Sequence, residues 1–211
     1  MSKQIRIDFV SDISCPWCVI GLKSLEQALE RVKGAIDAEI HFQPFELNPA
    51  MVAGGQDIGE HLAEKYGASA EQRAQTSEMI RARGAELGFT FNQRDRIYNT
   101  FDAHRLLHWA EMQGRGHALQ MALFDAYFTR SENPGDHAVL ARAAGDVGLD
   151  TAEAARILSS DTYTSEVRER QQYYQRAGIS SVPAIIINER HLISGGQPPE
   201  VFEQALRTIA A

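Results

Sequence analysis

The feature that most constrains this chain is a pair of cysteines, Cys15 and Cys18, separated by one proline and one tryptophan. They are the only 2 cysteines among 211 residues. A disulfide across so short a loop would restrict the unfolded chain very little, which argues against a structural role. The sequence has no second C-x-x-C to complete a zinc site. Reactive thiols are therefore predicted, with no metal, and a vestigial or metal-bound pair is the alternative.

The residues around the cysteines predict a strand that leads directly into a helix. Apolar and polar residues alternate over 5–10, which is typical of a short strand, and apolar residues recur at helical spacing over 16–34. Pro16 suits the first position of a helix, which places Cys15 at the positive end of the helix dipole. Such positions favour a thiolate. Cys15 is predicted to attack disulfides, and Cys18, one turn deeper, to resolve the mixed disulfide.

The rest of the chain divides into three parts by its pattern. The predicted parts are an N-terminal β-α-β half over 1–56, a helical insertion of six or seven helices over 57–177, and a C-terminal β-β-α half over 178–211. In the last part, the short β-branched run 183–187 is typical of a central strand covered on both faces.

Charge and hydropathy limit the classes of partner that this protein is expected to bind. The formal net charge is −7 and the basic residues are scattered, so no nucleic-acid partner is expected. No apolar run approaches the length of a membrane span, and the first residues lack a stretch of signal-peptide length. A cytoplasmic location without membrane contact is therefore expected. The arginine-rich stretches 81–83 and 168–170 are assigned to solvated faces.

Residues 8–18, which read DFVSDISCPWC, resemble the start of DsbA-like thioredoxin-fold proteins of the FrnE branch. The resemblance continues, in the same order, through four further blocks: FELNP at 45–49, NTFDAHR at 99–105, GISSVPA at 178–184 and ISGGQP at 193–198. Gly196 departs from the family, which more often has alanine there. The resemblance implies an α/β thioredoxin fold with a large all-helical insertion between its β-α-β and β-β-α halves.

The same resemblance implies several site residues. It implies a cis peptide bond between Val182 and Pro183 beside the cysteines, with the Val182 backbone available to pair with an extended substrate. His104 belongs to a block that lies over the active site in the family, and a structural histidine is an equal alternative.

Three further residues belong to the candidate site with less support. Trp17 is expected either to contact substrate or to cover the cysteine motif. Asn99 is expected to begin a helix as its N-cap rather than to touch substrate. Glu46 is expected to be a surface acid at the end of the second strand, and a proton shuttle for Cys18 is the less favoured alternative.

The predicted function is a thiol:disulfide oxidoreductase acting on protein or small-molecule thiols and disulfides. No dissociable cofactor is expected, and glutathione is a candidate co-substrate. One alternative is a glutathione-dependent isomerase or transferase of the 2-hydroxychromene-2-carboxylate isomerase or kappa type, in which serine usually stands where Cys15 does. The other is a non-catalytic thiol sensor or binding protein. The direction of electron flow and a homodimeric state are left open.

Overall fold

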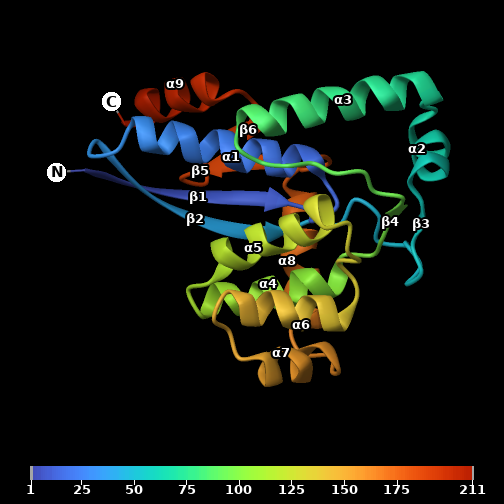
Figure 1. Ribbon diagram of the computed structural model, residues 1–211. Helices are drawn as coiled ribbons and strands as arrows, with labels where there is room; N and C mark the ends of the chain where they lie inside the picture. The colour runs from blue at the N-terminus through green and yellow to red at the C-terminus, as the bar shows by residue number, and fades with distance from the viewer. Residues whose placement is uncertain (1, 211) are drawn as a thin grey trace.

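A computed structural model describes residues 2–210 and shows a four-stranded sheet with helices on both faces (Figure 1). The strand order is β2-β1-β5-β6. β1 runs parallel to β2 and antiparallel to β5, and β5 is antiparallel to β6. The strands are β1 (Lys3–Ser11), β2 (Ile36–Pro44), β5 (Ala184–Ile187) and β6 (His191–Ser194).

The first strand of the chain lies inside the sheet, which explains its sequence. Ile7 in β1 is opposite Ile40 in β2 and Ile187 in β5. From Ile7 to Ser11 every residue is buried, so the alternation read from the sequence holds only for the outer half of the strand. The inner half is covered on both faces by helices, as strands with continuous burial are. β1 therefore delivers the cysteine loop from the centre of the molecule.

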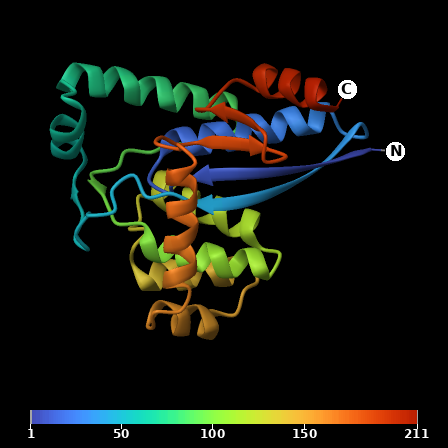
Figure 2. The same cartoon turned by 180° about the vertical axis from the view of Figure 1, so that it is seen from behind.

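The helices form one layer on each side of the sheet. Helix α1 (Pro16–Arg31) contacts α9 (Pro199–Ala210) and α3 (Ala70–Glu86) on one face. On the opposite face α4 (Phe101–Met112), α5 (Gly116–Phe124) and α8 (Thr164–Arg176) contact β2. The reverse view shows the same two layers (Figure 2). Helices α6 (His137–Asp146) and α7 (Thr151–Leu158) lie outside α4 and α5.

The expected order, β-α-β, then helices, then β-β-α, is observed. One part of the insertion differs from the expectation of helices alone. A two-residue strand, β4 (Arg96–Ile97), pairs antiparallel with β3 (Gln56–Asp57), and the pair stands beside α2 (Ile58–Tyr66). Two residues are too few to show the alternation of apolar and polar residues by which a strand is recognised in a sequence. A π-helix (Asp125–Thr129) follows α5.

Polar caps explain where several insertion helices begin. Ser69 and Gln72 form a reciprocal capping box at the start of α3. The carboxylates of Asp57, Asp136 and Asp150 accept hydrogen bonds from the first-turn amides of α2, α6 and α7.

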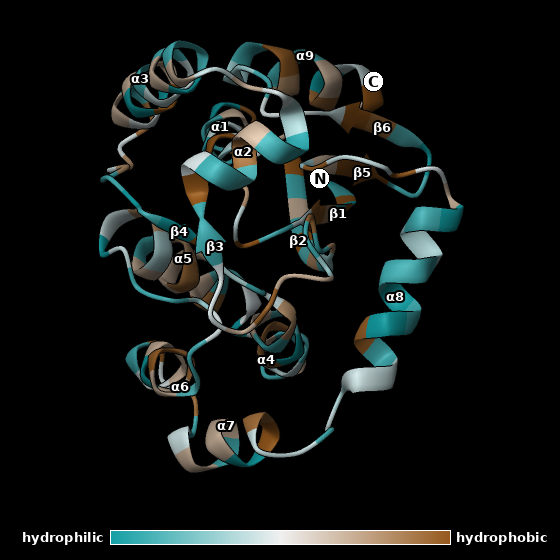
Figure 3. Cartoon of the chain, turned by 90° about the vertical axis from the view of Figure 1, so that its right-hand side faces the viewer, coloured by the Kyte–Doolittle hydropathy of each residue, from teal (hydrophilic) through white to brown (hydrophobic). Residues whose placement is uncertain are grey.

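One continuous apolar core joins the sheet to the insertion. Phe9 of β1 packs edge-on against Phe42 of β2, and Phe124 and Phe128 extend the core into the insertion. In Figure 3, β5 and much of β6 are coloured hydrophobic, whereas α8 is mostly hydrophilic. Among the described residues, no helix is both long and apolar enough to cross a bilayer.

Candidate active site

The two cysteines lie at the N-terminus of α1, in contact with each other. Cys15 is the N-cap residue and Pro16 opens the helix, as the sequence predicts. The Cys18 amide donates a 3.1 Å hydrogen bond to the Cys15 carbonyl. Both thiols are free, and Cys15 and Cys18 are 3.4 Å apart. A disulfide bond is about 2.05 Å long, so the structure holds the pair as an unbonded dithiol.

The environments of the two sulfurs differ. Cys15 is 3% exposed and lines a groove, whereas Cys18 is 0% exposed and does not line it. Burial, followed by the neighbouring Cys15, raises the pKa of the Cys18 thiol well above its ordinary value of 9.0. Cys18 is therefore a protonated thiol at neutral pH.

The loop before β5 completes the outer side of the site. The Cys15 thiol donates a 3.5 Å hydrogen bond to the Val182 carbonyl. The Val182–Pro183 peptide bond is cis, in agreement with the sequence resemblance. A Cβ on Gly21 of α1 would lie only 2.9 Å from Pro183 Cγ, so glycine at this position lets the proline sit directly against α1.

Comparison with known proteins decides the family. The model of the DSBA-like thioredoxin domain matches residues 6–207. The chain belongs to the DSBA-like thioredoxin domain family. It is 31% identical, over 96% of both chains, to the uncharacterized protein YwbO of Bacillus subtilis (strain 168).

Solved structures agree with this DSBA-like assignment. A probable DsbA oxidoreductase, SCO1869 from Streptomyces coelicolor, superposes with a TM-score of 0.89 at 34% identity, covering 98% of this chain and 89% of that one. The cytosolic disulfide reductase DsbM from Pseudomonas aeruginosa, solved with GSH, has a TM-score of 0.66 at 17% identity. That match covers 97% of this chain and 98% of DsbM, and at this identity it supports the fold alone.

A buried carboxylate, not predicted from the sequence, organises the loop of this DSBA-like domain. Asp12 is 1% exposed and accepts hydrogen bonds from the Ser14 hydroxyl (2.9 Å), the Leu47 amide (2.7 Å) and the Thr100 hydroxyl (2.7 Å). Burial alone would raise the Asp12 pKa. His104, the Leu47 amide and the Thr100 hydroxyl together outweigh burial, so the Asp12 pKa is lowered and the carboxylate stays ionised.

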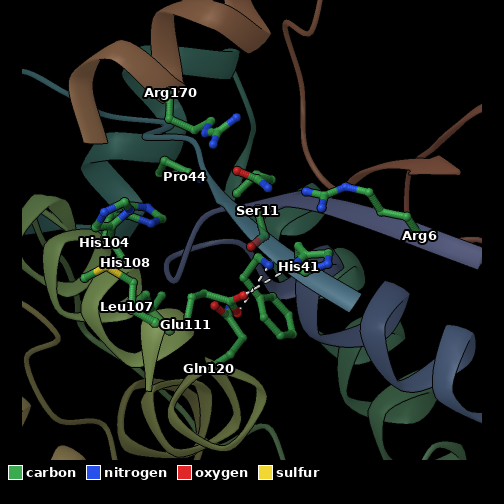
Figure 4. A pocket seen from close by; sticks show the side chains of 13 residues that line it. Arg6, Ser11, His41, Pro44, His104, Leu107, His108, Glu111, Gln120 and Arg170 are labelled. Atoms are coloured by element: carbon green, nitrogen blue, oxygen red, sulfur yellow. Dashed lines mark hydrogen bonds and ion pairs between the residues drawn. The ribbon is translucent and has the colours of Figure 1, made fainter. Parts of the chain in front are cut away.

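His104 lies behind this loop rather than in the groove. Its Nε2 is 3.5 Å from Asp12 Oδ1, and the side chain is 2% exposed. His104 also lines a separate cavity of about 160 Å³ together with His41, Glu111 and Gln120 (Figure 4). The structure therefore places His104 against the carboxylate that holds the cysteine loop.

Glu46 contradicts the expectation of a surface acid. It is 5% exposed, and its Oε2 accepts hydrogen bonds from Arg168 and from Gln171 Nε2 (3.0 Å). Arg168 in turn lies over the Phe101 ring, 3.7 Å from its centroid. Helix α8 packs against the end of β2 and covers the acid, which the sequence pattern does not reveal. Arg168 was expected on a solvated face, and although 40% of its side chain is exposed, its guanidinium binds the buried Glu46.

The N-cap of α4 lies one residue after Asn99, which was predicted to be the cap. Thr100 is the N-cap of α4, and Asn99 Oδ1 accepts a 2.9 Å hydrogen bond from the Phe101 amide. Asn99 Nδ2 donates to the Met51 carbonyl at 3.3 Å. Asn99 therefore stabilises the helix start from the residue before the cap, and it does not line the groove.

Cys15 opens onto a groove of about 680 Å³. Trp17 lines this groove, and the Arg83 guanidinium lies over the Trp17 ring, 5.6 Å from its centroid. Arg83 also donates a 3.0 Å hydrogen bond to the Gly196 carbonyl, so it is not on the solvated face expected for 81–83. The walls come mainly from α2, α3 and the segment after α3. Lining residues include Pro16, Leu62, Arg73, Ile80, Phe91 and Val182.

Proposed function

We propose that this protein is a thiol:disulfide oxidoreductase that cycles Cys15 and Cys18 between dithiol and disulfide. The observation that carries the proposal is the asymmetry of the pair. The two free residues are 3.4 Å apart, yet one lines a groove and the other is sealed in the core. Membership of the DSBA-like family supports the same chemistry.

The proposed reaction has two exchange steps. The Cys15 thiolate attacks one sulfur of a substrate disulfide, the substrate S–S bond breaks, and the departing thiolate takes a proton from solvent. Cys18 then loses its proton and attacks Cys15 Sγ, which breaks the mixed disulfide and releases the second substrate thiol. The substrate gains two electrons and two protons, and the cysteine pair loses them. The reverse sequence oxidises a dithiol.

The surrounding residues have separate roles in this scheme. The N-terminus of α1, opened by Pro16, stabilises negative charge on Cys15. The Val182 backbone, already in contact with the Cys15 thiol, is positioned to pair with an extended substrate. Asp12 acts as a positioning residue, because it holds the loop before Cys15 without lining the groove.

We also propose a cytoplasmic location and a place in the FrnE-like branch. The sequence blocks described above support the branch. The similarity in fold to DsbM, a cytosolic disulfide reductase, is in keeping with the location and with glutathione as a co-substrate.

Trapping of the mixed disulfide tests the proposed roles. A Cys18→Ser variant is expected to form a stable covalent adduct with a disulfide substrate, whereas Cys15→Ser is expected to form none under the same conditions. Mass spectrometry of both variants before and after dithiothreitol measures this. Equal adduct formation in both variants would contradict the assignment. Isomerase activity on 2-hydroxychromene-2-carboxylate with glutathione that survives in both variants would favour the alternative function.

A further inference from the structure

The groove beside Cys15 has the opposite charge to the molecule as a whole. The chain carries a formal charge of −7, yet no aspartate or glutamate is found among the described residues that line the groove. Three arginines line it, namely Arg73, Arg81 and Arg94. The only histidine in the lining, His61, has its pKa lowered, mainly by burial. The positive charge of the groove therefore comes from the arginines.

Two of these guanidinium groups are held in place without a carboxylate. Arg73 donates a 2.8 Å hydrogen bond to the Ala68 carbonyl. Arg94 lies over the rings of Tyr127 and Phe128, at 4.6 and 4.4 Å from their centroids. Within the described part of the chain neither makes an ion pair, whereas exposed Arg81 pairs with Glu78 at 3.5 Å. Arg73 and Arg94 thus keep N–H donors free for an anion.

The size and lining of the groove indicate how large such an anion is. About 680 Å³ lies within the range of small-molecule sites, roughly 300–1,000 Å³. Trp17, Ile80 and Phe91 line the same groove and supply apolar surface for a carbon skeleton. A cationic groove on an acidic protein also concentrates anions where the rest of the surface repels them.

Building on the proposed function, we propose that the groove selects low-molecular-weight disulfides that carry carboxylates. Arg73 and Arg94 bind the carboxylates, and the S–S bond lies within reach of Cys15. The exchange steps are those already described, so the new claim concerns only which disulfides reach the thiol.

Three small disulfides of different charge test the claim: 3,3′-dithiodipropionate, hydroxyethyl disulfide and cystamine, which are anionic, neutral and cationic. The second-order rate constant for oxidation of the reduced, full-length protein is measured by thiol labelling. Each rate is divided by that of free dithiothreitol with the same disulfide, which removes intrinsic reactivity. At low ionic strength the anionic substrate is expected to be preferred over the neutral one by about tenfold, and the preference is expected to shrink in high salt.

Matched variants assign the effect to the groove. Arg73→Gln and Arg94→Gln are each expected to reduce the normalised preference at least about threefold, whereas Arg94→Lys, which keeps the charge, should retain most of it. Arg156→Gln on α7 is the control, since Arg156 is exposed and does not line the groove, and it should keep the wild-type preference. A preference unchanged in both glutamine variants, or lost equally in the control, would overturn the claim.

The outcomes separate this claim from the proposed function. If hydroxyethyl disulfide fails to oxidise the Cys15–Cys18 pair, the oxidoreductase proposal itself fails. If it oxidises the pair but no anionic preference exists, only the selectivity claim fails. A disulfide peptide with flanking glutamates, compared with its glutamine counterpart, is the last arm. A larger charge preference for the peptide than for the small disulfides would contradict selection of small molecules.

Discussion

The Thr100 hydroxyl donates a 2.7 Å hydrogen bond to Asp12 Oδ1 and so joins the start of α4 to the loop that leads into Cys15. The other carboxylate oxygen accepts from the Leu47 amide, which follows β2. The loop before Cys15 and the residues after β2 therefore meet the start of α4, which belongs to the insertion, at one buried carboxylate. The insertion helps to hold the cysteine loop as well as to wall the groove.

Removal of this carboxylate is expected to cost stability. Asp12→Ala leaves the amide and hydroxyl of Ser14, the Leu47 amide and the Thr100 hydroxyl without their acceptor, and it is expected to lower the free energy of unfolding by about 3–5 kcal/mol. Thr100→Val removes one donor and should cost about 1–3 kcal/mol. Urea unfolding of both variants and of the double variant gives the coupling energy. Full additivity of the two changes would contradict a direct interaction.

The lowered pKa of Asp12 predicts a pH dependence with a definite sign. Because the folded-state pKa is below the ordinary 3.8, the stabilisation is fully present above that value and is lost as the pH falls through the folded pKa. The stability difference between wild type and Asp12→Asn is therefore expected to narrow below about pH 4. Urea unfolding of both proteins at several pH values measures it, and parallel stability curves would contradict the assignment.

The features predicted correctly from the sequence are local ones. Pro16 sets the start of α1, and the β-branched run at 184–187 forms a strand inside the sheet, because neighbouring residues carry both signals. Cys15 and Cys18 need only their spacing to be recognised as a pair. The deeper position of Cys18 was predicted as well, and the structure adds the groove that Cys15 alone lines.

The features that were missed depend on contacts between distant segments. Asp12 and Thr100 are 88 residues apart, and Glu46 and Arg168 are 122 apart. A single sequence contains no signal that pairs such positions. Asp12 was therefore not predicted as part of the site, and Glu46 was predicted to be a surface acid. Arg83 was misassigned for the same reason, since its contact with Trp17 appears only when α3 packs against α1.

The burial of Cys18 predicts a large difference in thiol reactivity. Alkylation requires the thiolate, and burial is the main cause that raises the Cys18 pKa. In Cys15→Ser, the remaining Cys18 is expected to react with iodoacetamide about a hundredfold or more slowly than Cys15 does in Cys18→Ser. Mass spectrometry at neutral pH measures both rates, with the urea-unfolded variants as controls. Similar rates in the folded proteins would contradict the assigned asymmetry.

Gly196 lies so close to α1 that alanine, the more usual residue in the family, is expected to destabilise the protein here. A Cβ there would lie 2.9 Å from the Trp17 carbonyl oxygen and 3.3 Å from Ile20 Cγ2, so Gly196→Ala is expected to cost about 1–3 kcal/mol. Gly54→Ala is the matched control, because nothing lies within 4 Å of its added Cβ. The control should be neutral or stabilising by up to about 1 kcal/mol. Equal unfolding free energies for the two variants would contradict the close approach.

The most direct test of the central claim is a redox titration of the wild-type protein in glutathione buffers. Tryptophan fluorescence reports the Cys15–Cys18 pair, and thiol labelling counts the free cysteines. A single reversible two-electron transition is predicted, with a midpoint between about −270 and −120 mV. Absence of a reversible transition, or oxidation that only adds glutathione separately to each cysteine, would contradict the account.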